Sequence, residues 1–291
     1  MGHRPATGSD VGERNGSLVR RRVLARELRL LREASGLTLE AAAPRLDFSI
    51  STLSRIETAQ QGVNVHGVKS MLDLYDAGDR WDELLTLARA ARQRGWWQHY
   101  GLGSNSYVGF ETEASRVRDF TTGYVPGLLQ TADYARAMIS AGLVWDAPAT
   151  LENAVTVRTI RQERLIDADD PLQLDAIVDE AVLHRPVGGP GVLGTQLAHL
   201  LTSIDLPTVT LQVLPTRVGA HPAQASGFML LTFGDLGEPD MAYVEHALGA
   251  VTLDKEPDVT RATLFFERLR AEALGLADSA DLVRRALKSI G

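Results

Sequence analysis

The sequence predicts a mostly α-helical N-terminal domain, followed by a C-terminal α+β domain with a small, mainly antiparallel sheet. In the first part of the chain, apolar residues recur at helical spacing as far as Ala168. Beyond Pro171, short runs of alternating apolar residues are separated by Gly and Pro, which is typical of strands. Consecutive short strands with helices at the ends indicate an α+β domain, and 291 residues are enough for two domains.

Four short helices are predicted between residues 18 and 78. The first ends at Gly36, because Gly is favoured just past the end of a helix. Thr38, Ser49 and Asn64 each precede an apolar-periodic segment and are predicted to cap the second, third and fourth helices. The second helix is expected at 39–46, and the third begins at Ser49 after a short turn.

The remaining elements follow from the same periodicities. Further helices are predicted at 79–94, 111–120, 128–142, 151–168, 192–204, 258–274 and 279–290, and strands at 174–178, 209–214, 228–233, 241–245 and 250–253. The chain is therefore divided into a disordered basic arm at 1–17, a helical domain at 18–78, a linker helix at 79–100 and the α+β domain at 101–291.

Composition excludes several classes of protein. The chain contains no Cys, which excludes disulfides, zinc thiolate sites and a cysteine nucleophile. The polar N-terminus has no apolar segment of the kind that secretory signals carry, and no window approaches ~18 uninterrupted apolar residues. We therefore expect a cytoplasmic protein with no membrane partner.

The charge is unevenly distributed along the chain. The net charge is −7, but residues 1–69 hold 11 Lys and Arg against 7 Asp and Glu, a net of +4, which leaves −11 for the remainder. Such asymmetry indicates a nucleic-acid-binding region on an acidic body. The local charge matters most to a phosphate, because salt limits the reach of an exposed charge to about 8–10 Å.

The third helix has the residue pattern of an element that lies in the major groove of DNA. Leu53 and Ile56 are three positions apart and can face inward, while small polar residues occupy the first turn and Arg55 follows one turn later. Arg55 could reach a guanine or a phosphate, although taken singly Ser49 could be only a cap and Arg55 only a solvated charge. The predicted DNA-binding residues are Thr38, Ser49, Ile50, Ser51, Thr52 and Arg55.

The strings GLTLEAA at 36–42 and STLSRIE at 51–57 resemble the Xre/Cro-type helix-turn-helix domain. The resemblance implies a transcriptional regulator that binds double-stranded operator DNA. Two residues depart from the family pattern. Leu39 stands where the family often has Gln, and Pro44 removes a backbone donor from the second helix and predicts a kink or a short helix.

Later strings resemble the WhiJ-type regulators of actinobacteria, nearly along the whole chain. They are RGWW at 94–97, ETEASR at 111–116, VPGLLQTADYAR at 125–136, DEAVLHRPVG at 179–188 and TLQVLP at 210–215. The resemblance implies a large C-terminal domain without a settled biochemical role. It also implies a regulator that is often encoded beside a small acidic partner protein and is sometimes described as antitoxin-like.

Other candidate sites are incomplete. The segment 185–191 lacks the Gly-Lys-Ser/Thr ending of a phosphate-binding loop and is interpreted as a turn. Glu180 and His184 have no third ligand at metal spacing and are interpreted as a structural pair. Ser226 before Gly227 is a weak nucleophile signal, and no catalytic set assembles. We therefore expect neither an enzyme nor a cofactor or metal.

An aromatic group with nearby arginines has three interpretations; its members are Trp96, Trp97, Tyr100 and Tyr107, with Arg92 and Arg94. They could stack on a single strand, line a ligand pocket between the domains, or pack the predicted linker helix against the C-terminal domain. We favour packing.

The function predicted is that of a sequence-specific, dimeric DNA-binding regulator, since palindromic operators mirror two-fold dimers. The helix at 79–94 and the C-terminal domain are the candidates for dimerisation. One alternative is an antitoxin-like module that binds a small protein from a neighbouring gene and regulates its own operon. Another is a sensor that binds a ligand in a C-terminal pocket.

Overall fold

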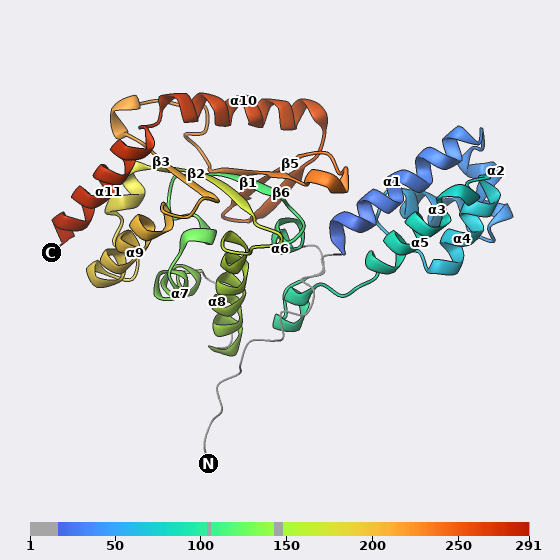
Figure 1. Ribbon diagram of the computed structural model, residues 1–291, viewed down its shortest axis with the longest axis horizontal. Helices are drawn as coiled ribbons and strands as arrows, with labels where there is room; N and C mark the ends of the chain where they lie inside the picture. The colour runs from blue at the N-terminus through green and yellow to red at the C-terminus, as the bar shows by residue number, and fades with distance from the viewer. Residues whose placement is uncertain (1–16, 104–105, 143–147, 291) are drawn as a thin grey trace, which may run out of the picture. The chain divides into compact units, whose positions relative to one another are not determined.

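The computed structural model describes residues 17–103, 106–142 and 148–290, and the chain forms two compact units (Figure 1). The helical unit ends at Glu113, and the sheet unit begins at Ala114. The arm predicted at 1–17 lies outside the described residues, apart from Ser17, which precedes the first helix. None of the described helices is both long and apolar enough to cross a lipid bilayer.

The helical unit is built from short helices around one apolar core. Its largest fully buried side chains include Leu28, Leu53, Met71 and Leu84, which come from four different helices. The helices are α1 (Leu18–Ala34), α2 (Leu39–Arg45), α3 (Ile50–Glu57), α4 (Val65–Leu74), α5 (Trp81–Ala90) and α6 (Tyr107–Glu111), with 3₁₀ turns η1 (Gly78–Arg80) and η2 (Trp96–Tyr100). The segment predicted as a linker helix thus contains α5, whose Leu84 and Ala88 belong to this core.

The helix starts are set by local hydrogen bonds, as the sequence predicts. The side chains of Thr38, Ser49 and Asn64 accept hydrogen bonds from backbone N–H groups in the first turns of α2, α3 and α4. Each cap satisfies a donor that the helix itself leaves unpaired. The capping predictions are therefore confirmed, and α2 is the short helix that Pro44 predicts, ending at Arg45.

The helix ends in this unit repeat one backbone motif. After each of α1 to α4 a residue takes the left-handed conformation, and the next N–H bonds back to a carbonyl five residues earlier, as Phe48 N does to Ala43 O at 3.0 Å. The left-handed residues are Gly36, Asp47, Ala59 and Asp76, with φ of 74°, 54°, 57° and 56°. Only the first is the Gly that this position favours.

The sheet unit contains a six-stranded mixed sheet in the order β3-β2-β1-β4-β5-β6. The strands β1, β2 and β3 are parallel, whereas β4, β5 and β6 pair antiparallel. The prediction of a small, mainly antiparallel sheet is therefore wrong. The strands are β1 (Arg116–Thr121), β2 (Gln173–Asp179), β3 (Val209–Leu214), β4 (Phe228–Thr232), β5 (Met241–His246) and β6 (Gly249–Leu253).

The error arises at β1, which was expected to be part of a helix at 111–120. Only the segment up to Glu111 is helical, in α6, and the chain is extended from Arg116. Both faces of β1 are covered, so Val117 and Phe120 are both fully buried and the alternation of apolar and polar residues is lost. Missing β1 removed the parallel pair β1–β2 from the prediction. The second parallel pair, β2–β3, was missed although a helix was predicted between these two strands, the order that indicates parallel pairing.

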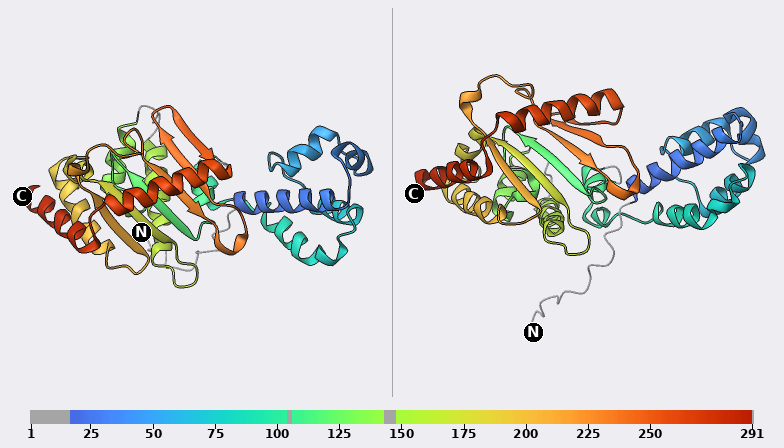
Figure 2. Two further views of the ribbon diagram at one scale, coloured as in Figure 1. Left: turned by 90° about the horizontal axis from the view of Figure 1, so that it is seen from above. Right: turned by 45° about the horizontal axis from the view of Figure 1, so that its top comes forward.

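Helices cover both faces of the sheet (Figures 1 and 2). The helix α10 (Glu256–Glu272) crosses one face, where Phe266 and Leu269 pack against Phe120 and Leu230. Figure 1 shows α7 (Ala132–Ser140), α8 (Pro148–Gln162) and α9 (Pro190–Ser203) on the other face. The C-terminal helix α11 (Leu276–Ile290) packs against α9 and β3. Parallel strands require such crossover helices between them.

Candidate nucleic-acid interface and a pocket in the sheet unit

The helix α3 divides its residues between the core and solvent. Leu53 and Ile56 are 0% and 3% exposed and pack in the core of the helical unit. Ile50, Ser51 and Arg55 are exposed, and Ile50 retains 45% of its accessible surface. An apolar side chain left in water at the first helical position is suited to contact with a thymine methyl group, and the neighbouring hydroxyl to a base edge or phosphate.

The hydroxyls of Ser49 and Thr52 bond to each other at the start of α3. Ser49 Oγ accepts the backbone N–H of Thr52 at 3.0 Å, and the two side-chain oxygens lie 2.9 Å apart. The structure therefore places Ser49 as a cap, with its side chain still exposed to solvent. Because a hydroxyl has one donor and two acceptor positions, a capping serine can still contact DNA.

Two arginines beside this surface carry uncompensated charge. Arg55, on α3, and Arg45, at the end of α2, are exposed and make no ion pair with any described residue. In contrast, the Arg29 Nε lies 2.8 Å from Glu33 Oε1 on α1. Each of the two helices of the turn therefore presents an exposed cation that can meet a phosphate.

A buried ion pair fixes α3 against α1. Arg32 Nε and Nη2 lie 2.7 and 2.8 Å from the two carboxylate oxygens of Glu57, and Arg32 Nη1 donates to Leu37 O at 2.7 Å. The hydrogen bonds to Glu57 raise the pKa of Arg32, and burial raises the pKa of the adjacent Tyr75. Sequence reasoning missed this pair, although a Glu beside Ile56 on the apolar face of α3 is a signal for it.

The start of α2 differs from the start of α3 because the carboxylate of Glu40 lies in its first turn. Hydrogen bonds from its own backbone N–H and from the Thr38 hydroxyl lower the pKa of Glu40. The positive end of the helix dipole, which would otherwise attract phosphate, therefore faces a side chain of the protein. Leu39 is partly buried against the core. It stands at the position where Xre/Cro-type domains often have the polar residue Gln. Thr38 caps α2 and is exposed at this surface.

The predicted aromatic cluster packs within the helical unit. Trp97 is fully buried, and its Nε1 donates to Gly103 O at 3.0 Å. Trp96 packs edge-to-face with Trp97 and Tyr100, both at 6.2 Å between ring centroids. Stacking on a nucleic-acid base needs an exposed ring face, which Trp97 does not have.

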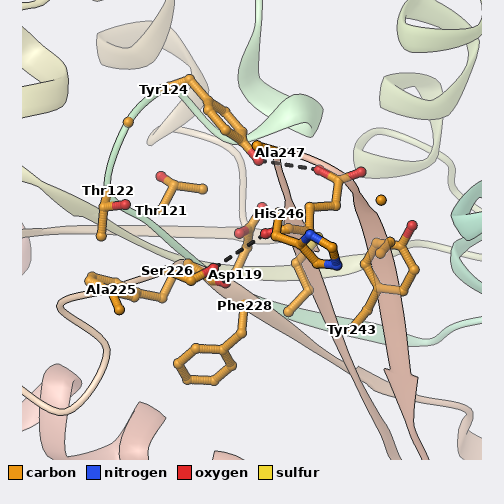
Figure 3. Close-up of a pocket in the computed structure, with 17 residues that line it drawn as sticks. Asp119, Thr121, Thr122, Tyr124, Ala225, Ser226, Phe228, Tyr243, His246 and Ala247 are labelled. Carbon is orange, nitrogen blue, oxygen red and sulfur yellow. Dashed lines mark hydrogen bonds between the residues drawn. The ribbon is translucent and has the colours of Figure 1, made fainter.

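The sheet unit contains a cavity of about 740 Å³ at the carboxyl end of β1 (Figure 3). Its walls come from three segments far apart in sequence: the end of β1 with the loop at 122–124, the loop at 225–227 before β4, and the β5–β6 turn. The polar side chains that line it are Asp119, Thr121, Thr122, Tyr124, Ser226, Tyr243, Glu245 and His246. Sequence reasoning identified none of them as a site apart from the weak signal at Ser226.

Close packing of the backbone forms one wall of this cavity. A Cβ atom at Gly227 would lie 2.4 Å from Phe120 O, so only glycine fits beside β1. Ser226 Oγ donates to Gly227 O at 3.0 Å and to Glu245 O at 3.2 Å. The hydroxyl thus donates to backbone carbonyls rather than to a general base, which a serine nucleophile needs.

The tyrosines of the cavity lie in a negative field. Tyr124 donates to Glu245 Oε2 at 3.2 Å, as the dashed line in Figure 3 shows. Burial raises the pKa of both Tyr124 and Tyr243, and the charge of Glu245 raises them further. Arg158 and Arg161, which are on α8, act in the opposite direction on Tyr124 and Tyr243 respectively.

The pair Glu180 and His184 lies in the 3₁₀ turn η5 (Glu180–His184), where Glu180 Oε2 accepts the N–H of Thr216 at 2.7 Å. Within the described ranges, no group of three or more His, Asp or Glu side chains is arranged to hold a metal ion.

Comparison with known families assigns both units. Residues 104–285 match the family model described as a domain of unknown function, DUF5753, and residues 23–85 match one described as a helix-turn-helix domain. The second match confirms the helix-turn-helix predicted from the sequence and is consistent with binding to double-stranded DNA. No curated protein and no solved structure shows significant similarity to the chain.

Proposed function

The chain belongs to the DUF5753 family and carries a helix-turn-helix domain at its N-terminal side, and from these two facts we propose that it is a sequence-specific transcriptional regulator. In this proposal α3 is the recognition helix, and the sheet unit senses a ligand or a partner protein. The resemblance of residues 36–42 and 51–57 to Xre/Cro-type domains supports the assignment of the DNA-binding element.

The observation that carries the proposal is the exposed face of α3. Ile50, Ser51 and Arg55 face solvent, while the opposite face is fixed in the core and by the Arg32–Glu57 ion pair. A recognition helix has to keep its shape in the groove, so rigid support behind exposed base-reading residues is what this role requires.

The contacts divide into two classes. Arg55 and Ser51 are one helical turn apart and read bases, whereas Arg45, Ser49, Thr52 and the cap of α2 position the backbone of the DNA. Base contacts determine which sequence is bound, and phosphate contacts determine how strongly salt weakens binding. Thr38 belongs to the second class, and its contribution is reduced by the neighbouring Glu40 carboxylate.

The regulator acts as a homodimer in this proposal. One recognition helix reads only a few base pairs, and a two-fold dimer reads two half-sites roughly 34–36 Å apart. Selection of bound sequences from a random DNA pool tests both statements. An inverted repeat with half-sites about one helical turn apart is expected, whereas an unpaired site or no enriched sequence would contradict the dimer or the sequence specificity.

Salt titration supplies a second test. Each phosphate neutralised by a cation releases counterions, so the logarithm of affinity should fall linearly with the logarithm of salt concentration. Arg45→Ala should reduce that slope by about one and weaken specific and random DNA alike. Arg89→Ala on α5, the matched control, removes an exposed charge from a helix outside α2 and α3. Equal effects from both variants would contradict the proposed surface.

A partner protein is the alternative to a ligand at the sheet unit. In that case the chain is an antitoxin-like module that binds a small acidic protein from a neighbouring gene and regulates its own operon. Co-expression of the full chain with each small protein encoded next to it separates the two possibilities. A stable complex would favour the partner protein. The absence of any complex would favour a ligand, for which the cavity at the end of β1 offers a site.

A further inference from the structure

We propose that the cavity at the carboxyl end of β1 is the effector site of this regulator and binds a small organic molecule through a protonated amine. The inference rests on the proposed function for its regulatory consequence, but the binding event itself is independent of DNA.

The position of the cavity in the sheet is that of a ligand site. β1 pairs with β2 in parallel on one side and with β4 in the antiparallel direction on the other. The direction of strand pairing therefore changes at β1. In open sheets with helices on both faces, ligands bind outside the carboxyl ends of strands where the topology changes direction. The volume of about 740 Å³ lies within the range of about 300–1,000 Å³ typical of small-molecule sites.

The lining selects for hydrogen-bond donors and positive charge. Asp119 and Glu245 both line the cavity, and no Lys or Arg is present among the described residues of its walls. An ionised carboxylate can only accept hydrogen bonds, so its preferred ligand is a donor. Arg158 and Arg161, on α8, lower the pKa of Tyr124 and Tyr243 respectively, but neither arginine lines the cavity.

A buried hydroxyl at the wall has no partner among the described residues. Thr121 is 4% exposed, lines the cavity, and its Oγ1 makes no hydrogen bond in the described part of the chain. An unsatisfied buried polar atom destabilises the free protein, and a ligand that hydrogen-bonds to it removes that penalty. This hydroxyl lies on β1, on the same face as Asp119, because side chains alternate along a strand.

Two aromatic rings complete the site. Tyr124 and Tyr243 line the cavity together with Glu245, and Tyr124 donates a hydrogen bond to the Glu245 carboxylate. Aromatic faces attract cations within about 6 Å of the ring centre, so rings beside a carboxylate favour an amine over a neutral amide of the same shape.

Binding can be measured on the full chain by saturation-transfer NMR with fragments that share one skeleton. The probes are tyramine, N-acetyltyramine and 3-(4-hydroxyphenyl)propanoate, together with equivalent amine, amide and acid triples on other small skeletons. Amine members are expected to bind, with at least tenfold weaker binding by the matched amides and acids. If no amine member binds, or if the acids bind as tightly, the proposal is overturned.

Variants locate the binding event. Glu245→Gln and Thr121→Val keep the shape of each side chain, and each is expected to weaken binding of the amine at least fivefold. Glu256→Gln makes the same chemical change on the exposed first turn of α10 and should leave binding unchanged. Amine binding that survives both cavity variants would overturn the assignment of the site, and circular dichroism checks that each variant is folded.

Operator affinity, measured with and without the best amine, tests the effector role separately. If the amine changes the affinity of the protein for the operator by some factor, the operator must change the affinity of the protein for the amine by the same factor. A change of about fivefold or more is expected. Amine binding without any such change would contradict the effector role and leave the DNA-binding proposal intact. Failure of the protein to bind any operator would contradict the proposed function, but the result of the amine-binding experiment would still hold.

Discussion

The carboxylate of Glu57 accepts two hydrogen bonds from the guanidinium of Arg32, with both residues more than nine-tenths buried. The pair joins the last residue of the proposed recognition helix to α1, and Arg32 also holds the carbonyl of Leu37 just before α2. One buried cation therefore fixes both helices of the turn, so the stability of the helical unit and the geometry of its exposed face depend on the same contact.

Removing one partner of this pair should destabilise the helical unit strongly. Glu57→Ala leaves the Arg32 charge buried without its partner, which typically costs about 3–5 kcal/mol. Urea denaturation measures the loss, followed by tryptophan fluorescence, to which the helical unit contributes three of the four tryptophans. Asp73→Ala removes an exposed carboxylate from α4, away from the Arg32 guanidinium in sequence, and should cost less than about 1 kcal/mol. Comparable losses from both variants would show that the buried pair has no special role.

Relieving backbone strain after α3 should stabilise the same unit. Ala59 has φ of 57°, a conformation that costs most L-residues free energy and costs glycine none. We expect Ala59→Gly to raise the free energy of unfolding by about 0.5–1 kcal/mol. The same substitution within a helix, Ala41→Gly in α2, should lower it by a similar amount. Thermal unfolding of the two variants checks the opposite signs, and a loss of stability in Ala59→Gly would refute the strain.

Removing the carboxylate at the start of α2 should strengthen binding to DNA. Glu40→Gln keeps the size of the side chain and leaves the positive end of the helix without a fixed negative charge. We expect affinity to rise severalfold for both specific and random DNA, with the largest gain at low salt. Asp73→Asn on α4 is a control for net charge. Fluorescence anisotropy can measure both, and unchanged or weaker binding by Glu40→Gln would place the DNA elsewhere.

The free energy of unfolding should also depend on the protonation of Glu40 as the pH is lowered. Because hydrogen bonds hold its pKa below 4.5 in the folded protein, the carboxylate contributes stability above the unfolded pKa. That contribution is lost as the pH falls through the folded value. Wild type and Glu40→Gln should therefore converge in stability as the pH falls below the folded-state pKa of Glu40. A stability difference that persists unchanged from pH 7 to pH 3 would show that these hydrogen bonds do not favour the ionised form.

The features that the sequence predicted well are those decided by neighbouring residues. The caps at Thr38, Ser49 and Asn64 depend on hydrogen bonds that span three residues. The division of α3 into a buried and an exposed face depends on the spacing of its residues within one helical period. Tertiary packing did not have to override these local preferences. The left-handed ends at Ala59 and Asp76 were less visible, since neither residue is the glycine that usually marks such a position.

The features that the sequence missed depend on distant segments. β1 is a strand because β2 and β4 pair with both of its edges, and those partners begin 57 and 112 residues after Arg116. The cavity needs segments from β1, the loop before β4 and the β5–β6 turn, and no periodicity within one segment reports that they meet. The Arg32–Glu57 pair likewise spans 25 residues and two helices.

The central claim is that α3 reads DNA sequence through Arg55, and one substitution tests it most directly. The affinities of wild type, Arg55→Ala and Arg89→Ala are measured on the selected operator and on a shuffled duplex at one salt concentration. We expect Arg55→Ala to lose about 1–3 kcal/mol on the operator and much less on the shuffled duplex, so that specificity falls, while Arg89→Ala retains the wild-type ratio. If Arg55→Ala retains that ratio as well, α3 does not read the operator through this residue.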